Sequence, residues 1–182
     1  MFWLILASIS TALFLVYNIV TITYLKRIPY SLSGTYYLLN DKKEGLGIWF
    51  SVFMIIDFLL LMSPWAYVSG QISQLGSYLT VLPFICCSTM IFVGIAPNIK
   101  TSERIERIHI ISALIGAITA LLWIFIVCWR IAYIVPACIL LFGGIAHLTK
   151  TAKSSRDYWL EMCAFFPTFT AIIVEFILNL HI

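Results

Sequence analysis

The sequence predicts an all-α integral membrane protein, a bundle of six transmembrane helices with both chain ends on the side opposite the cytoplasm. Three observations predict it. The 182 residues are 62% hydrophobic and only 10% charged, whereas a soluble domain normally carries about a quarter charged residues. Six apolar stretches lie near the ~20 residues that cross a hydrocarbon core as a helix. Almost all Lys and Arg residues fall in alternate loops.

The apolar stretches follow one another closely enough to form a single transmembrane domain over residues 1–182, because no polar segment is long enough to fold separately. The first lacks a basic start and a small-residue cleavage site, so we expect a mature helix rather than a signal peptide. Only two residues separate the fourth from the fifth, which predicts a tight hairpin near Arg130. The predicted helices cover residues 2–24, 46–68, 78–97, 109–129, 132–148 and 158–180.

The basic residues predict the orientation of these helices. All but one of the 11 Lys and Arg residues lie in the segments 25–45, 98–108 and 149–157, and the exception is Arg130. With six spans, these three segments share one side of the membrane, and the positive-inside rule places that side in the cytoplasm. We therefore expect a multi-pass protein of the plasma (inner) membrane with both termini outside.

The net charge and the positions of the cysteines also reduce the range of functions that the sequence supports. A net charge of +3 spread over several loops does not predict nucleic-acid binding. All five cysteines fall inside apolar stretches, which indicates free thiols packed as small apolar side chains. The sequence predicts no cofactor.

The longest polar segment, residues 28–45, is the first cytoplasmic loop. Pro29 ends the first helix, and Ser31 or Ser33 is placed to begin a short helix near residues 35–39. Tyrosines and leucines beside lysines are typical of a helix that lies in the headgroup layer. Two interpretations stay open: an interfacial elbow, or a lid over a pocket that faces the cytoplasm.

Small residues on the fourth and fifth helices predict close helix packing. Ser112, Gly116 and Ala120 recur at a spacing of four, and the fifth helix carries Gly143 and Gly144. Small side chains allow helix backbones to approach where lipid supplies no hydrophobic drive. We expect these two helices to pack as a close hairpin. The alternative is that Ser112, Gly116 and Ala120 form a homo-oligomer contact.

Three ionisable groups are expected near the cytoplasmic surface. His109 begins the fourth helix, His147 ends the fifth, and Glu161 lies near the start of the sixth. Ionisable groups at membrane depth are costly unless they are paired or hydrated. They either converge on a polar pocket beneath the first loop or stand as separate interfacial groups.

The sixth helix carries a polar stripe at heptad spacing, formed by Glu161, Thr168 and Glu175. Such a stripe is expected to face protein or water rather than lipid. Glu175 falls just below the outer headgroups, where the long side chain of Arg130 can reach it. We therefore predict a structural ion pair between Arg130 and Glu175, which ties the last helix to the hairpin.

Asp57 is the ionisable residue whose burial is most costly, because it falls in the middle of the second predicted helix. A carboxyl group near the bilayer centre must be protonated or must meet a partner or an ion. The polar residues expected at similar depth on the first and third helices are Asn18, Ser88 and Thr89.

Ser31, Asp57, His109 and His147 together resemble the pattern of the alkaline-ceramidase and progestin/adipoQ-receptor superfamily of membrane hydrolases, and of its small bacterial relatives. That resemblance implies a Ser, an Asp and three His around a zinc ion. The sequence departs from it in the last helix, where the paired His is absent, and His181 is predicted at the opposite face. We therefore predict no catalytic residue and no metal site.

These observations favour a bundle that binds or conducts a small solute, an ion or a proton over an enzyme. Such a bundle is a channel or a transporter, and one form of this hypothesis is a homo-oligomer. The alternatives are a non-catalytic membrane partner or regulated effector, and a metal-dependent intramembrane lipid hydrolase. Acidic groups at different depths suit a cation or proton, although two related halves, usual in transporters, are not evident. The candidate binding or conducting residues are Asp57, His109, His147, Glu161, Thr168 and Glu175.

Overall fold

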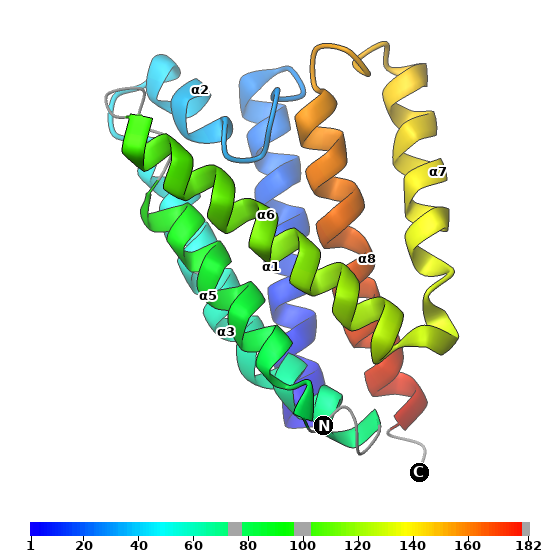
Figure 1. Ribbon diagram of the computed structural model, residues 1–182. Helices are drawn as coiled ribbons and strands as arrows, with labels where there is room; N and C mark the ends of the chain where they lie inside the picture. The colour runs from blue at the N-terminus through cyan, green and yellow to red at the C-terminus, as the bar shows by residue number, and fades with distance from the viewer. Residues whose placement is uncertain (73–77, 97–102, 180–182) are drawn as a thin grey trace.

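The computed structural model describes residues 1–72, 78–96 and 103–179, of which 103–105 are described by their backbone only. This described part contains helices and no strand. Figure 1 shows a bundle whose helices run up and down, with the short helix α2 at one end. The elements are α1 (Phe2–Leu25), α2 (Thr35–Lys42), α3 (Ile48–Ile72), α5 (Val81–Ile95), α6 (Glu103–Ile126), the 3-10 turn η1 (Trp129–Ile131), α7 (Ile134–Leu148) and α8 (Arg156–Asn179).

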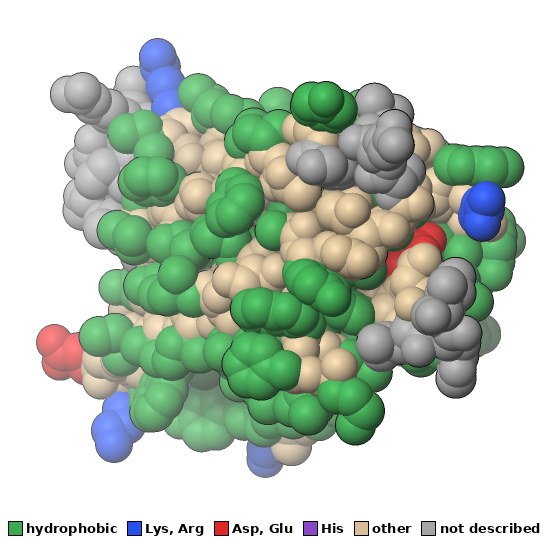
Figure 2. Space-filling view, turned by 90° about the horizontal axis from the view of Figure 1, so that it is seen from below, with side chains coloured by type: hydrophobic (Ala, Val, Ile, Leu, Met, Phe, Trp, Pro, Cys, Tyr) green, Lys and Arg blue, Asp and Glu red, His purple; other side chains and the backbone are tan. Residues whose placement is uncertain are grey.

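Five of the described helical segments are long and apolar enough to cross a membrane, and α5, with 15 residues, is a shorter apolar helix. The outer faces of these helices are rich in exposed Ile, Leu, Val and Phe side chains. Figure 2, which views the molecule from the end where α1 begins, shows hydrophobic side chains spread over that face with few charged ones. The prediction of an all-α bundle is confirmed, and its five long apolar helices are compatible with a membrane protein.

The predicted boundaries agree with the helices to within a few residues, with one clear exception. The fourth helix begins at Glu103, six residues before the apolar stretch that predicts it. Hydropathy marks where a helix enters lipid, and a helix can continue into water beyond that point. The short helix of the first loop is also present, from Thr35 to Lys42.

Helix α8 closes the bundle, because it packs against α1, α3, α6 and α7. On the other side, α3 packs against α1 and α5, and α5 packs against α6. The start of α1 and the end of α8 lie at one end of the bundle, and α2 lies at the other (Figure 1). We call the latter the α2 end.

The predicted close hairpin of the fourth and fifth helices is wrong. Helices α6 and α7 diverge from η1 (Figure 1), and α7 packs mainly against α8. The ring of Phe142 on α7 lies 5.3 Å from that of Phe166 on α8. A Cβ atom added at Gly143 or Gly144 would meet nothing within 4 Å. These glycines therefore face away from neighbouring helices, and α7 attaches through its larger apolar side chains instead.

The small residues of α6 are used within the chain. A Cβ atom at Gly116 would lie 3.0 Å from the hydroxyl of Thr89 on α5, and Ala120 is also buried. Ser112 is half-buried. The homo-oligomer through these residues stays a prediction, and Gly116 and Ala120 already serve the contacts of α6 inside one chain.

Helices α3 and α5 approach each other closely at Gly94. A Cβ atom there would lie 2.7 Å from the Cβ of Met54 and 3.3 Å from the backbone oxygen of Ser51. Neither atom is the free end of a flexible side chain, so only glycine fits. This close contact fixes α5 against α3.

Candidate functional site

Asp57 is completely buried, and its partner is Ser10 of α1. The Ser10 hydroxyl lies 2.7 Å from Oδ1 of Asp57 and 3.2 Å from the Asp57 backbone oxygen. Within the described part of the chain, Oδ2 of Asp57 has no hydrogen-bond partner. The sequence predicted Asn18, Ser88 or Thr89 as partner and missed Ser10. The signal was present, because Ala7, Ser10 and Phe14 lie on one buried face of α1.

Two further hydrogen bonds join α1 to its neighbours nearer the α2 end. The Tyr158 hydroxyl of α8 donates to Oδ1 of Asn18 at 2.9 Å, and both residues are buried. The hydroxyls of Tyr17 and Thr35 lie 2.6 Å apart and link α1 to α2. Polar side chains therefore continue along α1 from the bundle centre towards the α2 end.

An aromatic cluster fills the interior around these polar groups. The ring of Phe14 stacks on that of Phe169 at 4.8 Å and meets that of Phe165 edge-on at 6.2 Å. The ring of Phe58, next to Asp57 in sequence, lies 5.9 Å from that of Phe165. Aromatic pairs at these separations pack stably. In this arrangement the region around Asp57 is filled by rings and contains little polar surface.

Glu161 borders a cavity at the α2 end of the bundle. The cavity is partly open, has a volume of about 170 Å³ and is lined by the loop before α2 and by α3, α5, α6 and α8. Glu161 is the one ionisable residue among its lining side chains, and its carboxylate accepts a hydrogen bond from the backbone N–H of Leu32 in that loop. Met54 also lines the cavity, and Asp57 follows it by one helical turn. Glu161 thus lies at the cavity, and Asp57 lies beyond its inner wall.

The loop over this cavity is fixed to the start of α8. The backbone N–H of Tyr158 donates to the backbone oxygen of Tyr30 at 2.9 Å, and the Ser155 hydroxyl donates to the oxygen of Ile28 at 3.2 Å. Together with the bond between Leu32 and Glu161, these contacts attach the loop at three points. Leu32 and Ser33 of the loop line the cavity, and α2 follows them. The lid and the interfacial elbow both stay predictions.

The three groups expected to form a pocket beneath this loop divide into two sets. His109 is buried and its Nδ1 lies 2.9 Å from the backbone oxygen of Ala96. It stands one turn before Ala113, which lines the cavity beside Glu161. His147, in contrast, is exposed on α7. The structure brings Glu161 and His109 to the same region and leaves His147 outside it.

The polar stripe of α8 faces inward, as the heptad spacing indicates. Thr168 and Glu175 are 3% and 6% exposed. The Thr168 hydroxyl donates to the backbone oxygen of Ala164 in its own helix. Oε2 of Glu175 accepts a hydrogen bond from the Asn179 side chain at 3.0 Å. The Glu175 carboxylate also accepts a hydrogen bond from the thiol of Cys128, which follows α6. Thr168 therefore bonds only its own helix, whereas Glu175 also links α8 to the end of α6.

The predicted ion pair between Arg130 and Glu175 is not formed. The Arg130 and Glu175 side chains do not approach within the 4.0 Å of an ion pair, whereas the exposed Arg156 and Asp157 form one at 3.0 Å. The guanidinium of Arg130 instead lies 5.9 Å from the centre of its neighbour's ring, at Trp129.

The residues that carry the resemblance to membrane hydrolases are dispersed. Asp57 is in the bundle centre, Ser31 and His109 are near the α2 end, and His147 is on the exposed side of α7. His181 lies outside the described residues. In the described part of the chain, no group of three or more His, Cys, Asp or Glu side chains is close enough to hold a metal ion.

Comparison with known proteins adds no constraint on function. No family model, curated protein or solved structure matches this chain. Its function must therefore be inferred from its own groups, of which the buried Asp57 and the cavity beside Glu161 are the most unusual.

Proposed function

We propose that the protein binds a small cationic solute or a proton inside the bundle, and that Glu161 and Asp57 are the two acidic groups that receive it. The observation that carries this proposal is the cavity at the α2 end, whose one ionisable lining residue is Glu161. An acidic group that borders a partly open cavity in a membrane bundle is placed to bind a cation or exchange a proton.

The size and lining of the cavity favour a small occupant. Its volume of about 170 Å³ lies below the ~300–1,000 Å³ of pockets that bind drug-sized ligands. The rings of Phe50 and Phe165 line it together with Glu161. Aromatic rings beside a carboxylate attract a desolvated cation. A small amine or a proton suits this combination better than an anion or a large lipid.

Asp57 is proposed as the deeper acidic group. It follows Met54 of the cavity wall by three residues, or about 4.5 Å along the helix. Its Oδ2 lacks a hydrogen-bond partner within the described residues, and leaving a buried polar atom unsatisfied costs about 1–3 kcal/mol. A proton or cation on this carboxyl would offset that cost. Passage from Glu161 to Asp57 requires the rings of Phe58 and Phe165 to move.

The test is transport and binding in vesicles. Liposomes that contain the full chain should take up protons or a small amine such as methylammonium. Glu161→Gln and Asp57→Asn should each reduce this uptake at least about tenfold, because each removes a charged group that binds the cation. Glu44→Gln is the matched control, because Glu44 is an exposed carboxylate at the same end. Uptake unchanged in both interior variants would refute the proposal and favour a non-catalytic membrane partner.

We further propose that the chain crosses the plasma (inner) membrane six times, with the α2 end in the cytoplasm and both termini outside. Support comes from the basic loops and from Figure 1, in which α1 starts and α8 ends at the same end of the bundle. Helix α5, at 15 residues, has to complete its crossing with the residues that flank it.

Cysteine introduced at Lys42 or Lys153 should be labelled only from the cytoplasmic side, and at Tyr78 or Arg130 only from outside. Labelling of Lys42 and Tyr78 positions from one side would contradict six spans.

A further inference from the structure

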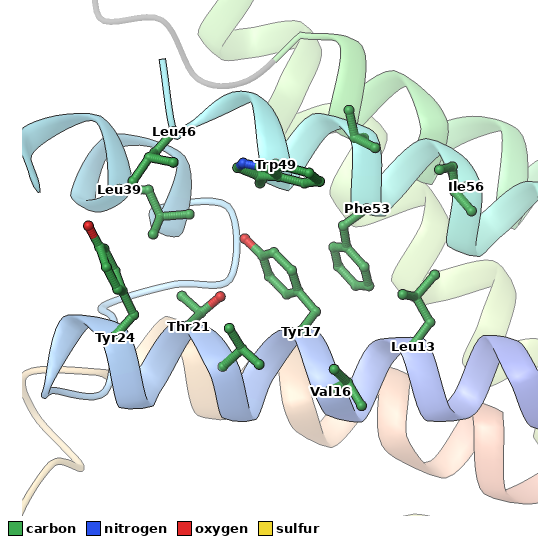
Figure 3. Close-up of a pocket in the computed structure, with 12 residues that line it drawn as sticks. Leu13, Val16, Tyr17, Thr21, Tyr24, Leu39, Leu46, Trp49, Phe53 and Ile56 are labelled. Atoms are coloured by element: carbon green, nitrogen blue, oxygen red, sulfur yellow. The ribbon is translucent and has the colours of Figure 1, made fainter. Parts of the chain in front are cut away.

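A second hollow lies on the outside of the bundle, between α1, α2 and α3 and separate from the cavity beside Glu161. It offers about 470 Å³, and nearly all its lining atoms are apolar. Figure 3 shows Leu13 and Ile56 at one end, Tyr17 and Phe53 in the middle, and Leu39 at the other end. We call this hollow the α1/α3 groove.

The groove has the length of one leaflet. Its lining on α1 runs from Leu13 to Tyr24, which is about 16 Å at 1.5 Å per residue. Half of a ~30 Å hydrocarbon core is about 15 Å. The Tyr17 hydroxyl, in the middle of the groove, is already bonded to Thr35, and the exposed lining is almost wholly apolar. What remains is an apolar channel open to lipid, into which an extended hydrocarbon chain fits.

At its α2 end, the groove lies beside the charged segments at the end of α1 and around the end of α2, which we call the α2 elbow. Tyr24, Leu39 and Leu46 lie together at that end (Figure 3). Charged residues lie two and three positions after Tyr24 and in the segment between Leu39 and Leu46, and all of them are exposed. They are Lys26, Arg27, Lys42 and Lys43, with Asp41 and Glu44 as the acidic members.

We propose that the α1/α3 groove holds one acyl chain of an anionic phospholipid, whose phosphate meets the basic residues of the α2 elbow. The charge there is net positive, and basic residues at a membrane surface attract anionic lipid by about 1 kcal/mol each. Trp49, which lines the groove and is 60% exposed, is of the residue type that settles at the headgroup boundary. A zwitterionic lipid fits the groove equally but lacks the net negative charge that the elbow attracts.

The test compares retention of two lipids. The full chain is mixed with vesicles of equimolar phosphatidylglycerol and phosphatidylcholine, extracted in mild detergent and weighed by native mass spectrometry. We expect one retained phosphatidylglycerol per chain. Val20→Trp fills the groove and should abolish its retention, whereas Ile19→Trp, on the neighbouring outward face, should leave it intact. Both positions are exposed, at 58% and 63%, so neither change disturbs the core.

The headgroup end is tested independently. Lys42→Gln and Lys43→Gln should each lower the preference for phosphatidylglycerol about fivefold, while Lys153→Gln, in the loop before α8, should not change it. Equal retention by Val20→Trp and Ile19→Trp would overturn the proposal, as would equal retention of the two lipids by the unchanged chain. A dimer whose contact is broken by Val20→Trp would also overturn it, since a second copy would then occupy the groove.

Discussion

Replacement of Ser10 by alanine tests how Asp57 is accommodated in the bundle centre. Both side chains are completely buried, and the Ser10 hydroxyl lies 2.7 Å from Oδ1 of Asp57. Ser10→Ala leaves that carboxyl without its partner, and an unsatisfied buried polar group costs about 1–3 kcal/mol. At about 2–4 °C per kcal/mol for a chain of this size, Tm should fall by about 2–12 °C. Thermal unfolding in mild detergent, followed by tryptophan fluorescence, measures this change.

Thr11→Ala is the matched control. The Thr11 hydroxyl bonds the backbone oxygen of Ala7 in its own helix, at 2.8 Å, so its loss should change stability by only about 0.5 kcal/mol. In an Asp57→Leu background, Ser10→Ala should cost much less than in the unchanged chain, because the partner is already absent. Equal effects of Ser10→Ala and Thr11→Ala, or a full additive loss in the double variant, would refute the assignment of Ser10 as the partner of Asp57.

Three further predictions concern other contacts of the bundle. Gly94→Ala should lower the free energy of unfolding by about 1–3 kcal/mol, because the added methyl group clashes with α3. Gly143→Ala, whose methyl group would contact no neighbouring atom, should leave the free energy of unfolding unchanged or raise it by up to about 1 kcal/mol. Equal Tm values of the two variants would contradict this packing. Tyr158→Phe leaves the buried Asn18 oxygen without its donor and should cost about 1–3 kcal/mol, so an unchanged Tm would show that water replaces the hydroxyl. Arg130→Gln should change Tm by no more than about 1 °C, because exposed charges without a close ion pair contribute little to stability. A large fall in Tm would instead support the ion pair of Arg130 with Glu175.

The membrane-embedded, helical character of the protein was predictable, because lipid requires long apolar segments and these are visible in composition alone. The partners of each helix were not. Lipid-facing and protein-facing side chains are equally apolar, so hydropathy does not distinguish the two faces. The repeated small residues around Gly116 predicted a close pair of α6 and α7, whereas the close contact of α3 and α5 depends on Gly94, which belongs to no such repeat.

The candidate site was predictable in its acidic members and not in their surroundings. Asp57 and Glu161 stand out in sequence because carboxylates are rare at membrane depth. Ser10 does not, since serine in an apolar helix commonly bonds its own backbone. His109 and His147 look alike in sequence, and only the packing of α7 on the far side of α8 separates the buried ring from the exposed one.

The bond between Ser10 and Asp57 also bears on how the chain enters the membrane during synthesis. The two residues are only 47 positions apart, and α1 packs directly against α3. When α3 leaves the insertion machinery, the helix that carries the hydroxyl has already been made. The carboxyl of Asp57 can therefore meet its partner before α5, α6, α7 and α8 exist, and α3 can enter lipid as half of a pair rather than as a lone helix with an unpartnered acid. Ser10→Ala should then reduce the yield of inserted protein more than its effect on the finished bundle accounts for.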